Sequence, residues 1–124
     1  MQILKHAFRQ YVTLDSLEST IDFYSRLQGV PCERRLSFAE TGIEVAVVGA
    51  FILLGGTEEA LATVQHVQAT FIVDSLDEFA MWLEKNGAQV TAEPRHSPVG
   101  RNLTVRHADG FIAEYFQPAD AAQG

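Results

Sequence analysis

Hydrophobic and polar residues alternate in several short stretches of this chain, and two longer stretches with helical spacing separate them. Residues 6–14 place Phe8 and Val12 on one face of an extended chain and Arg9 and Tyr11 on the other. This alternation predicts a strand. Residues 16–27 then recur with helical spacing and end close to Gly29, which suits a left-handed cap. The side chains expected to face the sheet from this helix are Leu17, Ile21, Tyr24 and Leu27.

Three further strands are predicted in the first half of the chain, at residues 31–39, 43–48 and 50–54. Gly42 and Gly49 separate them, and two glycines end the series at residue 56. A short acidic stretch, residues 57–65, follows as a connector. Residues 6–56 are therefore predicted to form one module with the order strand, helix, strand, strand, strand.

The second half of the chain repeats this order. A strand is predicted at residues 66–73, a helix at 75–86, and strands at 88–92, 102–107 and 111–117. Residues 94–100 are expected to form a loop, and residues 108–110 a hairpin turn. The helix should turn Leu76, Phe79, Ala80 and Leu83 inward. Residues 66–118 thus form a second predicted module.

A short motif marks the strand-to-helix switch in both modules. It reads LDSLE at residues 14–18 and VDSLD at residues 73–77, an offset of 59 positions. Asp15 and Asp74 are the residues predicted to cap the two helices. A fixed offset indicates tandem modules. We therefore predict an α+β fold in which two βαβββ modules, within one domain spanning residues 1–124, form a curved mixed sheet around a cleft with the helices outside.

Composition limits the classes of partner. The chain has 124 residues, 47% of them hydrophobic, and it contains neither an apolar run of membrane-spanning length nor a signal-peptide pattern, so a cytoplasmic location is expected. Its net charge of −7 argues against nucleic acid and anionic membranes and favours cationic ligands. A single cysteine, Cys32, excludes an intrachain disulfide and a thiolate metal cluster.

The module order, the two helix switches and the closing hairpin at residues 109–114 resemble the vicinal oxygen chelate superfamily. That superfamily contains glyoxalase I, extradiol dioxygenases, methylmalonyl-CoA epimerase, and the fosfomycin and bleomycin resistance proteins. The likeness covers residues 6–117. It implies a small molecule bound in a cleft, and in the metal enzymes a divalent ion such as zinc, nickel or manganese.

The resemblance also implies four metal-ligand positions. The usual histidine of the first strand is replaced by Arg9, and the usual glutamate of the fourth strand by Leu53, to within one residue. The third position is Gln68 and the fourth is Glu114, the one position that fully keeps the usual residue. Because arginine and leucine donate no lone pair, we expect no metal cofactor. The alternative is a divalent metal held by Gln68, Glu114 and a recruited His66.

Strand alternation predicts which other side chains share the cleft face. Polar groups and aromatic rings both occur there, a combination that suits a planar small molecule held by a few hydrogen bonds. Glu114 is the candidate catalytic residue. The candidate ligand-binding residues are Arg9, Tyr11, Leu53, Gln68, Thr70, Asn102, Thr104 and Phe116.

Three functions remain open from the sequence. The first is a metal-free protein of the bleomycin resistance type, which binds a small aromatic or cationic molecule. The second is an isomerase, lyase or dioxygenase-like enzyme that uses Glu114 with or without a divalent metal, and the third is a scaffold without a ligand. A homodimer is expected, because strand edges and cleft faces are not fully covered within a chain of this size.

Overall fold

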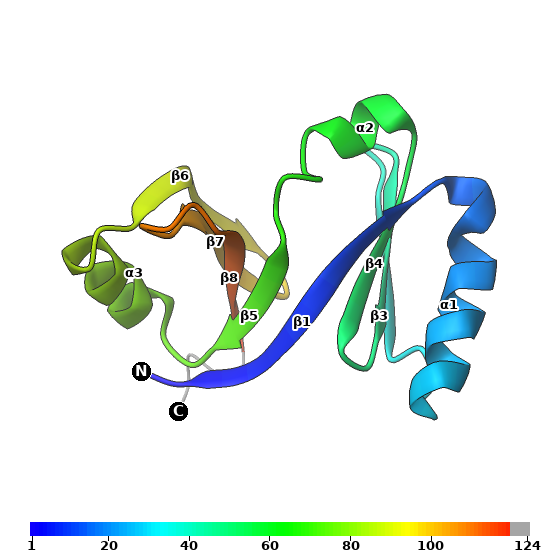
Figure 1. The fold of residues 1–124 in the computed structure, drawn as a ribbon, viewed down its shortest axis with the longest axis horizontal. Coiled ribbons are helices and arrows are strands. Elements are labelled where there is room, and N and C mark those ends of the chain that lie inside the picture. Colours follow the sequence, from blue (N-terminus) through cyan, green and yellow to red (C-terminus); the bar gives the residue numbers. More distant parts are fainter. Residues whose placement is uncertain (120–124) are drawn as a thin grey trace. The chain divides into compact units, whose positions relative to one another are not determined.

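Apart from one short helix in the acidic connector, strands and helices follow one another in the order that the hydrophobic pattern predicts (Figure 1). The structure is a computed structural model that describes residues 1–119. Its elements are β1 (Ile3–Val12), α1 (Leu14–Gln28), β2 (Arg34–Phe38), β3 (Ile43–Val48), β4 (Phe51–Gly55), α2 (Glu58–Ala62), β5 (Ala69–Val73), α3 (Leu76–Lys85), β6 (Gln89–Ser97), β7 (Gly100–Arg106) and β8 (Ile112–Pro118).

The eight strands join in the order β2-β3-β4-β1-β5-β8-β7-β6. In each half of the chain the first strand pairs in parallel with the last one, β1 with β4 and β5 with β8, while the neighbouring hairpins are antiparallel. This is the pairing of two βαβββ modules in one mixed sheet. The predicted α+β fold is confirmed.

The chain divides into two compact units. The first unit comprises Ala7–His66, and the second unit comprises Met1–His6 together with the chain from Val67 onward. Strand β1 therefore begins in the second unit and ends in the first. Among residues 1–119, no helix is long and apolar enough to cross a membrane.

In the first unit, α1 packs on the face of β3 and β4 that carries Ala46, Val48 and Leu53, with Leu17 as its central buried side chain. The other face of these strands carries Ile43 and Leu54, and Leu61 of α2 packs against them. The acidic connector therefore contains a short helix, which covers apolar surface and begins at a Thr57 cap.

In the second unit, α3 packs its inward side chains on β7 and β8. Leu76, Phe79 and Leu83 are buried there, and Ala80 is partly buried, as the helical spacing predicts. The facing sheet residues are Leu103, Val105, Ala113 and Tyr115. The hairpin turn before β8 is also confirmed, with Gly110 in a left-handed conformation that a glycine adopts without strain.

The predicted helix caps are wrong. Thr13 accepts the hydrogen bond from Ser16 N and caps α1, while Ser75 accepts from Glu78 N and caps α3. Asp15 lies inside the first turn of α1, and Asp74 instead accepts a hydrogen bond from Gln2 N at 2.8 Å. Relative to the repeated motif, the helix therefore begins three positions earlier in the first module than in the second. In each module the cap is the first residue after the strand that carries a hydroxyl, because this hydroxyl can accept from the free N–H groups of the first helical turn.

The inward position of Leu27 is also wrong, because this side chain is exposed. Gln28 faces the sheet in its place. Its Nε2 donates to Val48 O at 2.9 Å, and its Oε1 accepts from Ala50 N at 2.8 Å. The turn between β3 and β4 presents backbone groups here, and a glutamine satisfies them where a leucine cannot.

The predicted loop at residues 94–100 is mostly strand. β6 continues to Ser97, and β7 begins at Gly100, so the connection is a tight turn. Register shifts between Val90 and Ala92, and between Ala92 and Arg95, interrupt the pairing with β7. β6 is an edge strand, and such irregularities accommodate a proline that has no N–H to donate.

Candidate functional site

The second unit has a polar sheet face opposite α3. Along β8 the buried residues Ala113 and Tyr115 point to the helix, and Glu114 and Phe116 alternate with them on the other face. Register pairs Glu114 with Thr70 of β5 on one side and with Thr104 of β7 on the other. The face assignment made from strand alternation is therefore correct for this unit.

Two neutral donors contact the Glu114 carboxylate at this face. The Thr70 hydroxyl donates to its Oε1 at 3.3 Å, and the Asn102 amide donates to its Oε2 at 3.2 Å. Thr70 is only 2% exposed, so its hydroxyl is fixed by its surroundings. Because the two bonds engage different carboxylate oxygens, they restrain the orientation of the whole group.

Apolar surface adjoins the carboxylate. Phe116 is the register partner of both Ile72 and Asn102, and all three are partly buried. Its ring lies over Gly100, where a Cβ would come within 2.8 Å of the ring. Because Gly100 has no side chain, the Phe116 ring can contact the backbone there. Phe116 follows Glu114 by two residues in β8.

Gln68 has a local structural role. Its Oε1 accepts from Ile112 N at 3.1 Å, and its backbone N donates to Ile112 O at 2.8 Å. These bonds tie the residue before β5 to the start of β8. His66 is exposed and belongs to the first unit.

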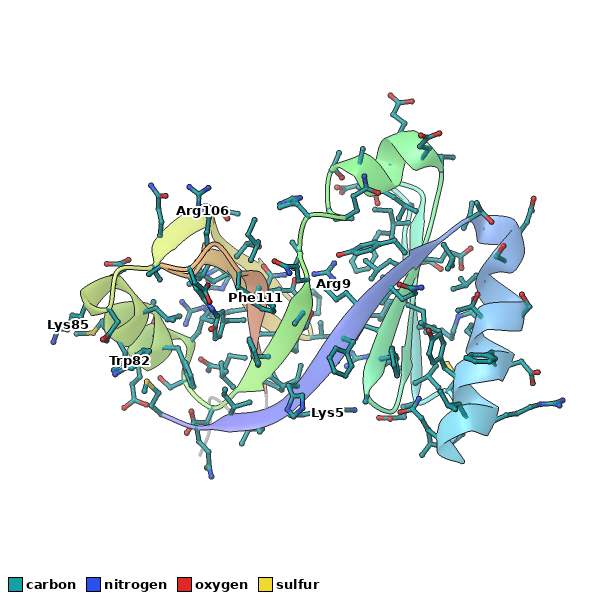
Figure 2. The ribbon with its side chains drawn as sticks, viewed as in Figure 1. Lys5, Arg9, Trp82, Lys85, Arg106 and Phe111 are labelled. Carbon is teal, nitrogen blue, oxygen red and sulfur yellow. The ribbon has the colours of Figure 1, made fainter. Side chains whose placement is uncertain are left out.

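In the first unit, Arg9 and Tyr11 lie on the face of β1 opposite α1. Arg9 extends from β1 (Figure 2), and its guanidinium carbon lies 5.6 Å from the centroid of the Tyr11 ring. The Tyr11 hydroxyl donates to Val64 O at 2.9 Å, which fixes the ring beside the segment after α2. The register partners of Arg9 and Tyr11 in β4 are Ile52 and Leu54.

The placement of Leu53 on that face is wrong. Leu53 is 0% exposed and packs with Leu17, Ala46 and Val48 beneath α1. Successive strand residues point to opposite faces, so an offset of one residue moves a side chain from one face to the other. The positions that share a face with Tyr11 are Ile52 and Leu54, one on each side of Leu53.

Sequence reasoning missed a polar pair beneath α3. His107 Nε2 lies 2.7 Å from the Tyr115 hydroxyl, and the His107 ring stacks on Phe111 with a centroid distance of 5.5 Å. Burial raises the pKa of Tyr115 to about 12. Because Tyr115 adjoins Glu114 along β8, this pair fixes the strand that carries the carboxylate. Only the aromatic pattern around the hairpin could have suggested it.

Comparison with known proteins identifies relatives of this fold. No protein-family model and no curated protein matches the sequence. An uncharacterized protein from Methanosarcina mazei is 42% identical over 96% of this chain and 95% of its own, with a TM-score of 0.87. Methylmalonyl-CoA epimerase from Mycobacterium tuberculosis is 17% identical over 98% of this chain and 93% of its own, with a TM-score of 0.71. The Streptomyces coelicolor epimerase (Q60A), in complex with 2-nitronate-propionyl-CoA, is 19% identical over 95% of this chain and 99% of its own, with a TM-score of 0.68.

The chain has the fold of these epimerases, which is the fold that the resemblance of its sequence to the vicinal oxygen chelate superfamily implies. At 17–19% identity the two epimerases share the fold with it, and their substrate does not transfer on that likeness alone.

The residues at the four metal-ligand positions that the resemblance implies do not suit a divalent ion. Arg9 carries a fixed positive charge and no lone pair, and Ile52 and Leu54 offer only hydrocarbon at the second position. At the third position, the Gln68 oxygen already accepts the bond from Ile112 N. Among the side chains that the structure describes, no three of His, Cys, Asp or Glu gather closely enough to hold a metal. Glu114 alone keeps a carboxylate.

Proposed function

We propose that this protein binds a small aromatic or cationic molecule at the polar face of its second unit, with Glu114 as the anchoring group and without a metal ion. The observation that carries the proposal is the Glu114 carboxylate held between Thr70 and Asn102. An ionised carboxylate only accepts hydrogen bonds, so the ligand must supply N–H or O–H donors. Phe116 and Ile72 supply adjoining apolar surface for a flat ring.

The net charge of the chain supports the choice of a cationic ligand. A charge of −7 raises the local concentration of cations, and a charge-assisted hydrogen bond is roughly twice as strong as a neutral one. Binding of such molecules in a cleft resembles the bleomycin resistance branch of the superfamily, in which sequestration is itself the activity.

The test uses benzamidine as an aromatic cation and benzamide as its neutral analogue, in a thermal-shift assay with EDTA present. Benzamidine should raise the melting temperature and benzamide should not. Saturation at about 100 times the dissociation constant adds about 2.7 kcal/mol to the free energy of unfolding.

Two variants make the assay specific for the site. Glu114→Gln keeps the shape of the side chain and removes its charge, so it should abolish the benzamidine shift. Glu84→Gln is the matched control, because Glu84 is exposed on α3 and its substitution changes the net charge equally. Equal shifts in both variants, or a shift that requires added metal, would contradict the proposal.

An isomerase or lyase is the second candidate, favoured by the same restrained carboxylate. Glu114 would act as the base that removes a proton next to a carbonyl group. The epimerase complex with 2-nitronate-propionyl-CoA makes an acyl-CoA thioester the first substrate class to try. Proton NMR of propionyl-CoA in D₂O should show exchange at the α-carbon with the wild-type protein and none with Glu114→Gln. If the wild-type protein does not exchange the α-proton, the isomerase or lyase candidate is contradicted and only the binding role remains.

The dioxygenase alternative needs a metal ion to activate oxygen. The residues at the four positions offer one carboxylate, so we do not propose this chemistry for the chain.

A further inference from the structure

The polar face of the second unit changes character along its strands. Phe116 of β8 and its register partner Ile72 of β5 form an apolar row. Glu114 lies in the next row, two residues back along β8. Ile112 and its register partner in β7, Arg106, form the row after that. An aromatic ring, a carboxylate and a guanidinium therefore follow one another in this order across one sheet face.

Strand alternation places Arg106 on this face. Val105, the residue before it, is 0% exposed and packs beneath α3, so Arg106 points away from that helix. Its register partner in β6 is Gln89, and the two side chains meet, because Arg106 Nη2 donates to Gln89 Oε1 at 2.8 Å. Arg106 extends from the sheet (Figure 2). The bond to Gln89 thus fixes the guanidinium beside the row that contains Glu114.

The Arg106 guanidinium keeps hydrogen-bond donors for an anion. It presents five N–H groups in a planar fork, and the bond to Gln89 uses one of them. The side chain is exposed, and Gln89 is its only side-chain partner among the residues that the structure describes. The other edge of the fork can therefore bind a carboxylate through two parallel hydrogen bonds.

The spacing of the two charged side chains limits the ligand that can reach both. Arg106 lies two residues along β7 from Thr104, which is the register partner of Glu114. Such diagonal neighbours are roughly 7–8 Å apart at the backbone, within reach of long side chains. The cationic and anionic groups of the ligand must therefore lie close together. In an α-amino acid, a single carbon atom joins the ammonium group to the carboxylate.

Phe116 decides where the apolar part of the ligand lies. It follows Glu114 along β8, whereas Ile112 and its partner Arg106 precede Glu114. A ring that packs against Phe116 therefore points away from the guanidinium. The ring and the carboxylate of the ligand must branch from the atom that carries the cation, and the α-carbon of an aromatic amino acid has this arrangement.

We propose that the ligand of this site is an aromatic α-amino acid, with its ammonium group on Glu114, its ring on Phe116 and its carboxylate on Arg106. This inference rests on the proposed function, because it takes Glu114 as the anchor of a cationic group. Arg106 is then the specificity-determining residue, which selects amino acids over simple amines. A simple carboxylic acid is repelled by a chain of net charge −7, whereas a zwitterion has no net charge.

The test is isothermal titration calorimetry at low ionic strength with EDTA present, at about pH 6, where α-amino groups are protonated. L-phenylalaninamide keeps the ring and the ammonium group of L-phenylalanine and replaces the carboxylate with a neutral amide. The wild-type protein should bind L-phenylalanine about tenfold more tightly than the amide, the gain expected of a hydrogen bond between charged groups. The acid 3-phenylpropionate, which lacks the ammonium group, should bind more weakly than either.

Two variants locate the carboxylate contact. Arg106→Gln should bind L-phenylalanine about tenfold more weakly than the wild type and L-phenylalaninamide at least as tightly, so the preference disappears. Arg34→Gln is the matched control, because Arg34 is exposed on β2 of the first unit and its loss changes the net charge equally. This control should keep the preference. Circular dichroism checks that both variants are folded, as expected for exposed positions.

The outcomes separate this proposal from the proposed function. If L-phenylalaninamide binds and L-phenylalanine binds no more tightly, the amino acid proposal is overturned and the cation site stands. A preference that persists in Arg106→Gln, or that Arg34→Gln also removes, overturns it as well. If Glu114→Gln weakens neither ligand, or if neither ligand binds the wild type, the cation site itself fails and this proposal fails with it.

Discussion

Replacement of Leu53 by alanine tests which face of β4 lies under α1. The side chain is 0% exposed and packs against Leu17, Ala46 and Val48. A leucine-to-alanine change at a fully buried site costs about 2.7–5 kcal/mol, because it removes apolar contacts and leaves a cavity. A domain of this size has a total stability of about 5–15 kcal/mol, so the loss is a large fraction of the whole.

The expected change in melting temperature follows from the size of the chain. An unfolding entropy of about 2.1 cal/mol/K per residue gives about 0.26 kcal/mol/K for 124 residues. The Leu53→Ala variant should therefore melt about 10–19 °C below the wild type. Urea unfolding followed by circular dichroism measures the same loss of free energy. An unchanged slope of the unfolding free energy against urea concentration shows that the unfolded state is unaffected.

Ile52→Ala is the matched control on the opposite face. Ile52 is the register partner of Arg9 and is only partly buried, so its truncation should cost about 1 kcal/mol. The more decisive pair is Leu53→Glu, which should prevent folding, and Ile52→Glu, which should fold, because a carboxylate cannot be buried beneath α1 without a partner. The reverse order of stabilities would refute the assignment of faces in β4 and return Leu53 to the candidate site.

Three further predictions concern the second unit. Gln117→Met removes the side-chain oxygen that accepts the first N–H of α3 at 2.7 Å, so this buried donor is left unsatisfied. Urea unfolding should show a loss of about 1–3 kcal/mol in the free energy of unfolding. The control Gln65→Met, at an exposed position, should show no measurable loss. The N–H of Gln2 lowers the pKa of Asp74, so its carboxyl should titrate below 3.8 by NMR, and its contribution to stability should be present above that pH and lost as the pH falls through the folded value. Burial raises the pKa of Tyr115 to about 12. The stability that the neutral phenol contributes should therefore be complete below its ordinary pKa of 10 and lost between pH 10 and about 12. Ultraviolet titration of the wild type, compared with Tyr115→Phe, measures the pKa.

The candidate site was predicted from the sequence in the second unit more completely than in the first. There the alternation of β7 and β8 placed Asn102, Thr104, Glu114 and Phe116 on one face, and the structure confirms this placement. In the first unit the same reasoning failed for Leu53, because β4 is apolar on both faces and alternation gives no signal. The ligand-binding roles of these residues remain predictions.

The sequence by itself determined the two modules, the order of their strands and main helices, and the buried residues of α3, because these follow from periodicities of two and 3.6 residues along the chain. The tertiary structure alone decided features that depend on residues distant in sequence. Thr70 bonds Glu114 across 44 positions, and Gln28 rather than Leu27 faces inward because it satisfies the turn at residues 48–50. Strand register and the hydrogen-bonding needs of neighbouring backbone set such contacts, and neither is written in the local pattern.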